Sequence, residues 1–89
     1  MRINVTQRDI DIETRSCCPQ SPIVRAANRL KHISGAYLDM ESEEIRFTPV
    51  PQRAVGPEVH GYALPDVAVA FIHAFDKYER VHPFAFEIH

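Results

Sequence analysis

The sequence predicts a small α+β domain with a mostly antiparallel sheet of four to five strands and about three helices. Apolar residues recur with a period of two near both ends and in the middle of the chain, and with the helical period of 3.6 between these segments. The predicted order is β-α-α-β-β-(β)-α-β, without the regular alternation of a doubly wound parallel sheet. With 89 residues, we expect one domain, 1–89.

The first elements follow from a strand pattern and a helix cap. Residues 2–6 alternate between polar and apolar side chains and predict a short, half-buried strand. Thr6 is then a typical N-cap, and Asp9, three residues later, completes a capping box. We therefore expect a helix from Gln7 to about Glu13.

A loop over 14–20 separates this helix from a second one. Ser21 and Pro22 supply a capping hydroxyl and a first-turn proline, so a helix is expected to run to about His32. At helical spacing its two faces differ in polarity. The apolar face contains Ile23, Ala26, Ala27, Leu30 and Ile33, and the polar face contains Arg25, Asn28, Arg29 and His32.

The middle of the chain predicts a β-hairpin. Strands are expected over 36–40 and 45–50, joined by a polar turn at 41–44. Pro49 indicates that the second strand lies at a sheet edge or ends there. The segment that follows is either a loop or an irregular strand around 58–62.

The strongest helical pattern covers 65–79 and leads into a final strand in HPFAFEIH, 82–89. We expect the inward residues of this strand to pack on the apolar stripe of the helix, which makes the C-terminus a core element. The stripe contains Val67, Phe71, Ala74, Phe75 and Tyr78, and the inward strand residues are Phe84, Phe86 and Ile88.

Composition and charge argue against several classes of protein. A formal net charge of −2 argues against a general nucleic-acid binder, which usually carries a basic excess. No run approaches the roughly 18 apolar residues that cross a bilayer, and the charged N-terminus does not resemble a secretion signal. We therefore expect a cytoplasmic protein, with Cys17 and Cys18 as free thiols because neighbouring cysteines rarely bridge.

Four carboxylates are concentrated in the hairpin turn. They form either an acidic hook for an Arg- and Lys-rich protein surface or a solubilising loop tip. These partner-binding candidates are Asp39, Glu41, Glu43 and Glu44.

A second candidate surface is the basic face of the second helix. Arg25, Arg29 and His32, with Arg15 nearby, have the spacing to dock a phosphate or an acidic partner. Arginines are also common on helix faces that simply contact solvent.

Catalytic and metal patterns are weak. The histidines are scattered and the cysteines lack paired metal spacing, so no metal or other cofactor is expected. Cys18 as a nucleophile, or His73 with Asp76 as a base and its orienter, are possible arrangements, but a solvated helix face explains the latter pair more simply. No phosphate-binding loop or hydrolase motif is present, which favours a non-enzymatic protein.

Two segments carry a resemblance to a family. INVTQRDID (3–11) with SPIVRAANRL (21–30), and PDVAVAFIHAFDKYERVHPFAFEI (65–88), resemble small uncharacterised phage and prophage accessory proteins. Members tend to carry Gly near Glu13 and Cys where Ser21 stands, so cysteine chemistry does not define the group. The resemblance implies a phage or mobile-element accessory gene and brings no known activity.

These observations lead to two functional hypotheses. The first is a non-enzymatic accessory protein that binds a host protein with a basic surface, and a defence inhibitor of the anti-CRISPR kind is its sharpest version. The alternative is a small nucleic-acid-associated or regulatory domain that uses the basic helix face, with binding that weakens steeply as salt rises.

Overall fold

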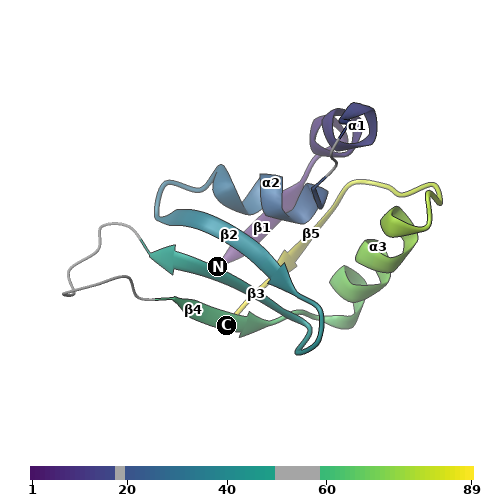
Figure 1. Cartoon of the computed structure of the whole chain (residues 1–89). Coiled ribbons are helices and arrows are strands. Elements are labelled where there is room, and N and C mark those ends of the chain that lie inside the picture. Colours follow the sequence, from purple (N-terminus) through teal and green to yellow (C-terminus); the bar gives the residue numbers. More distant parts are fainter. Residues whose placement is uncertain (18–19, 50–58) are drawn as a thin grey trace.

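A computed structural model describes residues 1–17, 20–49 and 59–89 of the chain. It has three helices and five strands in these ranges, in the predicted order (Figure 1). The elements are β1 (Arg2–Val5), α1 (Gln7–Arg15), α2 (Pro22–Asn28), β2 (Ile33–Asp39), β3 (Glu44–Pro49), β4 (His60–Ala63), α3 (Asp66–Asp76) and β5 (Phe84–Glu87).

The strands form two antiparallel sheets, whereas we expected one. The first joins the two ends of the chain, because β1 pairs with β5. The second is a meander in the order β2-β3-β4. Of the two alternatives for the segment around 58–62, a loop or a strand, the structure has the strand, β4. Strand β3 ends at Pro49 as predicted, but it is the central strand, so the alternative of an edge position is wrong.

The second helix is shorter than predicted and β2 begins earlier. The helix ends at Asn28 and not near His32, and β2 begins at Ile33 and not at residue 36. The β2–β3 register shifts between Ser34 and Tyr37, with Gly35 at a φ of 63°. This irregularity breaks the alternation that identifies a strand, which explains why the sequence pattern predicts the end of a helix where β2 begins.

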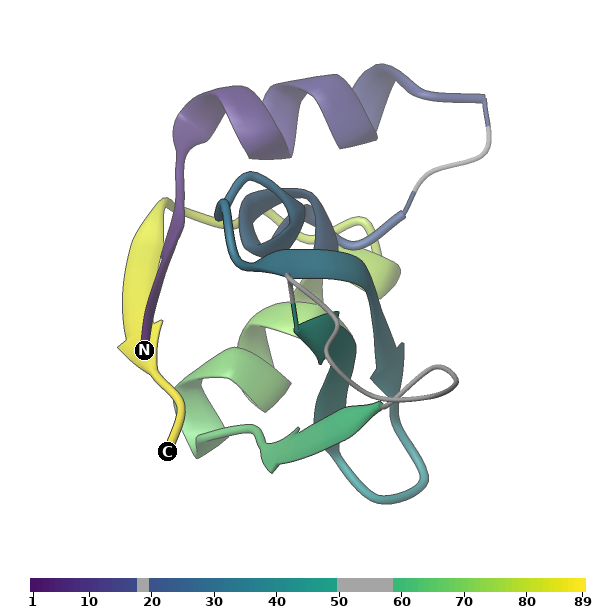
Figure 2. The same ribbon diagram turned by 90° about the vertical axis from the view of Figure 1, so that its left-hand side faces the viewer.

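Helix α2 bridges the two sheets. It packs against β1 of the first sheet and β2 of the second, while α1 lies on its outer side (Figure 2). Its predicted apolar face is confirmed for Ile23, Ala26 and Ala27, which are buried, whereas Leu30 and Ile33 lie beyond the end of the helix. This arrangement places α1 in an outer layer, where only one of its faces meets the rest of the protein.

The C-terminal strand is a core element, as predicted. The ring of Phe84 packs on Phe71 of α3 with centroids 4.7 Å apart, and on Phe86 at 5.5 Å. The predicted stripe of α3 is partly wrong, since Val67 is 55% exposed and Tyr78 94% exposed. Helix α3 is apolar on several sides, and its buried face is centred on Ala68, Phe71 and Ile72.

Candidate functional site

Two of the four acidic residues at the hairpin share one arginine, which offsets one of their two negative charges. Asp39 ends β2 and pairs across the hairpin with Glu44, which begins β3. The guanidinium of Arg46 lies 3.2 Å from the Asp39 carboxylate and 2.9 Å from that of Glu44. The hydrogen bond to Glu44 raises the pKa of Arg46, so its guanidinium stays charged.

The other two acids form what we call the hairpin tip, Glu41 and Glu43. Both are exposed and neither has an ion pair with the described residues. The turn is held by local bonds, because the Asp39 carboxylate accepts the backbone N–H of Glu41 at 3.2 Å. Glu43 has a φ of 54°, and its carbonyl accepts the N–H of Leu64 at 2.9 Å. The tip therefore presents two uncompensated carboxylates on an ordered turn.

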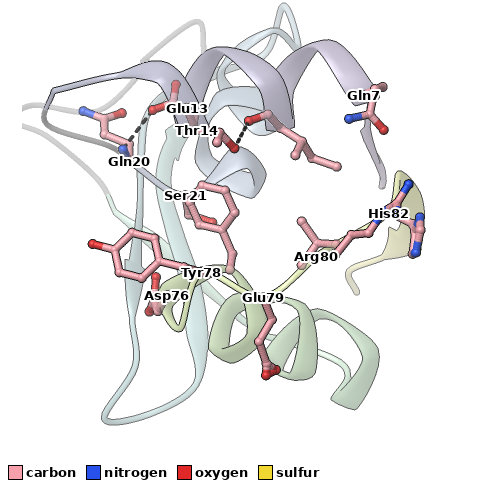
Figure 3. A pocket seen from close by; sticks show the side chains of 13 residues that line it. Gln7, Glu13, Thr14, Gln20, Ser21, Asp76, Tyr78, Glu79, Arg80 and His82 are labelled. Atoms are coloured by element: carbon pink, nitrogen blue, oxygen red, sulfur yellow. Dashed lines mark hydrogen bonds between the residues drawn. The ribbon is translucent and has the colours of Figure 1, made fainter.

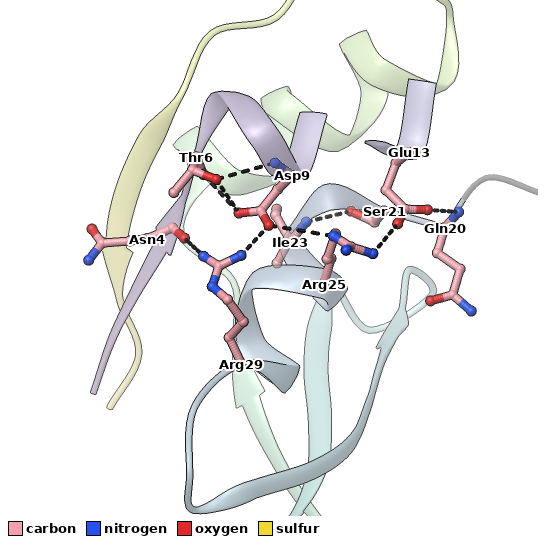
Figure 4. A network of polar contacts seen from close by, with 9 residues as sticks. All are labelled: Asn4, Thr6, Asp9, Glu13, Gln20, Ser21, Ile23, Arg25 and Arg29. Carbon is pink, nitrogen blue, oxygen red and sulfur yellow. Dashed lines mark hydrogen bonds and ion pairs between the residues drawn. The ribbon is translucent and has the colours of Figure 1, made fainter. Parts of the chain in front are cut away.

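Arg25 of α2 and Arg29, the C-cap of this helix, meet acids of α1. We call this contact the α1–α2 seam, made by Asp9, Glu13, Arg25 and Arg29 (Figure 4). Arg29 hydrogen bonds with Asp9, whose side chain is 1% exposed. Arg25 lies 3.4 Å from the carboxylate of Glu13 and 3.8 Å from that of Asp9. The two helices are therefore joined by a ladder of ion pairs.

The seam also anchors neighbouring backbone. Asp9 accepts the N–H of Thr6 at 2.8 Å and the Thr6 hydroxyl at 3.0 Å, and Thr6 accepts the N–H of Asp9 in return, so the predicted capping box is confirmed. Glu13 accepts the N–H of Gln20 at 2.8 Å, and Arg29 donates to the carbonyl of Asn4 at 2.9 Å.

Burial and hydrogen bonding act in opposite directions on Asp9. Burial by itself raises the pKa of this carboxyl, but the hydrogen bonds from Arg29 and Thr6 outweigh it and hold the pKa below its usual value. Asp9 is therefore a charged, structural residue.

The predicted basic face is thus largely committed to intramolecular contacts. Arg25 and Arg29 are paired with acids, and His32 is exposed in the turn after α2. Nucleic-acid binding by this face stays a prediction, with less unpaired charge than the sequence suggested. Sequence reasoning missed that Asp9 and Glu13 are the partners. The available signal was two acids four residues apart on one helix and two arginines four apart on the next.

A cleft that sequence reasoning did not anticipate lies between α1 and residues 75–82 (Figure 3). It has a volume of about 610 Å³. Ile10 of α1 and Val81 contribute apolar surface, whereas Asp76, Arg80 and other polar residues line its margins. The cleft is separate from the hairpin tip, so the molecule has two candidate contact surfaces.

Among the described residues, the remaining catalytic candidates, His73 and Asp76, are not assembled into a site. His73 and Asp76 are both exposed on α3, and no hydrogen bond joins them. Cys17 is exposed, while Cys18 lies outside the described residues. Within 1–17, 20–49 and 59–89, no group of three His, Cys, Asp or Glu side chains is arranged to hold a metal ion.

None of the helices in the described ranges is long and apolar enough to span a membrane. No protein-family model, no curated protein and no solved structure matches the chain.

Proposed function

We propose that this protein acts by binding another protein, not by catalysis, and that the hairpin tip makes the contact. The supporting observation is the difference in charge pairing around the hairpin. Glu41 and Glu43 are exposed and have no ion pair with any residue that the structure describes, whereas their neighbours share Arg46. Uncompensated carboxylates attract a basic surface over a distance and favour the correct orientation on contact.

The shape of the tip favours the same function. Its backbone is held by the Asp39 carboxylate and by the hydrogen bond from Leu64 to Glu43. A surface that is already ordered loses less conformational entropy when it binds, so more of the interaction energy contributes to affinity. The partner that fits is a protein surface rich in arginine and lysine. A host protein is expected from the resemblance to phage accessory proteins, with a subunit of a defence complex as the most specific form.

The test is a charge reversal at the tip. Tagged wild-type protein and the Glu41→Lys/Glu43→Lys variant are used to capture partners from bacterial extract, and each partner is quantified by mass spectrometry. We expect recovery of the true partner to fall at least about tenfold in the variant, because attraction becomes repulsion. Thermal unfolding is expected to be nearly unchanged, since both side chains are exposed.

The control is Asp11→Lys/Glu87→Lys, which changes the net charge equally on α1 and β5. Because Glu87 has ion pairs with the N-terminus and Arg2, thermal unfolding of the control is measured as well. The control is expected to retain the partner. Equal recovery with the tip variant and the wild type would contradict the proposal. Equal loss with both double variants would also contradict it, because net charge and not the tip would then control binding.

A further inference from the structure

The cleft between α1 and residues 75–82 has the size and lining of a binding site (Figure 3). Its volume of about 610 Å³ falls in the range of roughly 300–1,000 Å³ that is typical of ligand sites. Its apolar part is formed by Ile10, which is buried, and by Phe75 and Val81, which are partly buried. Polar side chains surround this part, so the cleft can hold apolar and charged groups together.

The end of α3 at this cleft has an unusual backbone. The N–H of Tyr78 bonds to the carbonyl of Phe75 at 3.1 Å, and that of Glu79 to Ala74 at 2.9 Å. These two bonds form a Schellman motif, in which the residue at Tyr78 adopts left-handed geometry and is usually glycine. Tyr78 has a φ of 61° and its side chain is 94% exposed. Its ring therefore brings strain without packing that would offset it.

Asp76 is a second residue whose type is unfavourable at its position, the C-terminal end of α3. It is the last residue of α3, where the helix dipole presents negative charge and disfavours a carboxylate. It is exposed and has no ion pair with the described residues. Departures from local preference concentrate at functional sites, where a side chain is kept for something other than stability. Tyr78 and Asp76 together therefore mark this end of the cleft.

The charges of the cleft indicate what it holds. Tyr78 and Asp76 lie at one end, and Arg80 and His82 at the other (Figure 3). An exposed aromatic ring beside a carboxylate suits a guanidinium, which stacks on the ring and pairs with the acid. Arg80 has no ion pair with the described residues and suits an acidic group.

We propose that the cleft binds an extended segment of a protein partner, with an arginine on Tyr78 and Asp76 and an acidic residue on Arg80. The wall formed by α1 between Gln7 and Thr14 is about 10 Å long at the helical rise of ~1.5 Å per residue. Three residues of extended chain at ~3.3 Å each cover this length, and a probe peptide with its two charges three residues apart therefore matches the length of the cleft. This inference extends the proposed function, since it also requires a protein partner, but it uses a surface separate from the hairpin tip.

The probe is the peptide acetyl-Gly-Arg-Leu-Ser-Glu-Gly-amide, titrated into the full chain and followed by NMR chemical shifts. We expect shifts at Tyr78, Asp76 and Arg80. A peptide with citrulline in place of arginine has the same shape without the charge, and is expected to bind about tenfold more weakly because it loses the ion pair and the cation–π contact.

The decisive variant is Tyr78→Gly. It is expected to raise the thermal midpoint, because glycine suits the left-handed position, and to weaken peptide binding about tenfold. Asp76→Asn removes one charge without changing the shape of the side chain. It is expected to weaken peptide binding independently of the Tyr78 ring. Glu41→Lys/Glu43→Lys is expected to leave binding of this peptide unchanged, so failure at the cleft is distinguishable from failure at the hairpin tip.

Three results would overturn the inference. The first is unchanged peptide binding in both Tyr78→Gly and Asp76→Asn. The second is equal affinity for the arginine and citrulline peptides, or shifts that lie outside the cleft. The third is a lower thermal midpoint for Tyr78→Gly, because the ring would then be kept for stability.

Discussion

Helices α1 and α3 flank the same cleft, but different forces hold them in place. Helix α1 is attached by the α1–α2 seam, in which the buried Asp9 pairs with Arg29. Helix α3 is attached by aromatic packing, in which Phe71 contacts Phe84 of β5. Ion pairs depend on the protonation of their acids, whereas aromatic packing depends on volume. The two walls of one cleft therefore respond to different perturbations.

Removing an aromatic ring is expected to have the largest effect. Phe71→Ala deletes a buried ring that packs on Phe84, and we expect it to lower the free energy of unfolding by about 3–4 kcal/mol. Urea denaturation gives this value. Val67→Ala is the matched control on the same helix, because Val67 is mostly exposed, and its effect is expected to stay within about 0.5 kcal/mol. Similar losses in both variants would refute the assigned buried face of α3.

Breaking the α1–α2 seam is expected to have a somewhat smaller effect. Asp9→Asn removes the charge that pairs with Arg29 and weakens the capping box. We expect this change to lower the free energy of unfolding by about 2–3 kcal/mol. The value lies below that of a fully buried pair because the Arg29 side chain is 48% exposed and can be hydrated. Asp11→Asn, on the same helix, is the control for urea denaturation. A difference below about 0.5 kcal/mol between the two variants would show that the seam does not hold α1.

Low pH is expected to weaken the ion pairs that hold α1, because it protonates Asp9. The folded-state pKa of Asp9 lies below the ordinary value of 3.8, so unfolding takes up a proton at low pH. The stability that Asp9 contributes is complete above about pH 4 and is lost as the pH falls through the folded-state pKa. Urea midpoints measured from pH 6 downward are expected to fall less steeply in Asp9→Asn than in the wild type. Parallel profiles would contradict this role.

Much of the fold was predictable because it depends on local patterns. The capping box of Thr6 and Asp9 and the Pro22 helix start involve residues only a few positions apart. The C-terminal strand was predicted from the alternation of Phe84, Phe86 and Ile88. The failures arose where local patterns were ambiguous, as at Val67, which lies on a helix with apolar residues on several sides.

The candidate surfaces were less predictable. The acidic cluster of the hairpin was visible in the sequence, but the division into paired and unpaired acids depends on Arg46 from the next strand. The basic face was also visible in the sequence. Its pairing with acids of α1 was not, because Arg29 and Asp9 are twenty residues apart in the chain. Charge on a surface is decided by which groups meet in space, and composition does not report this.

By itself, the sequence determined the α+β class, the order of the elements and the inclusion of the C-terminus in the core, because these follow from periodicity and capping among neighbouring residues. Only the tertiary structure decided that α1 closes over Arg25 and Arg29, and that Tyr78 leaves the helix and stands exposed at a cleft. These features depend on how helices pack and end against one another, and that packing sets which charges are neutralised and which remain for a partner.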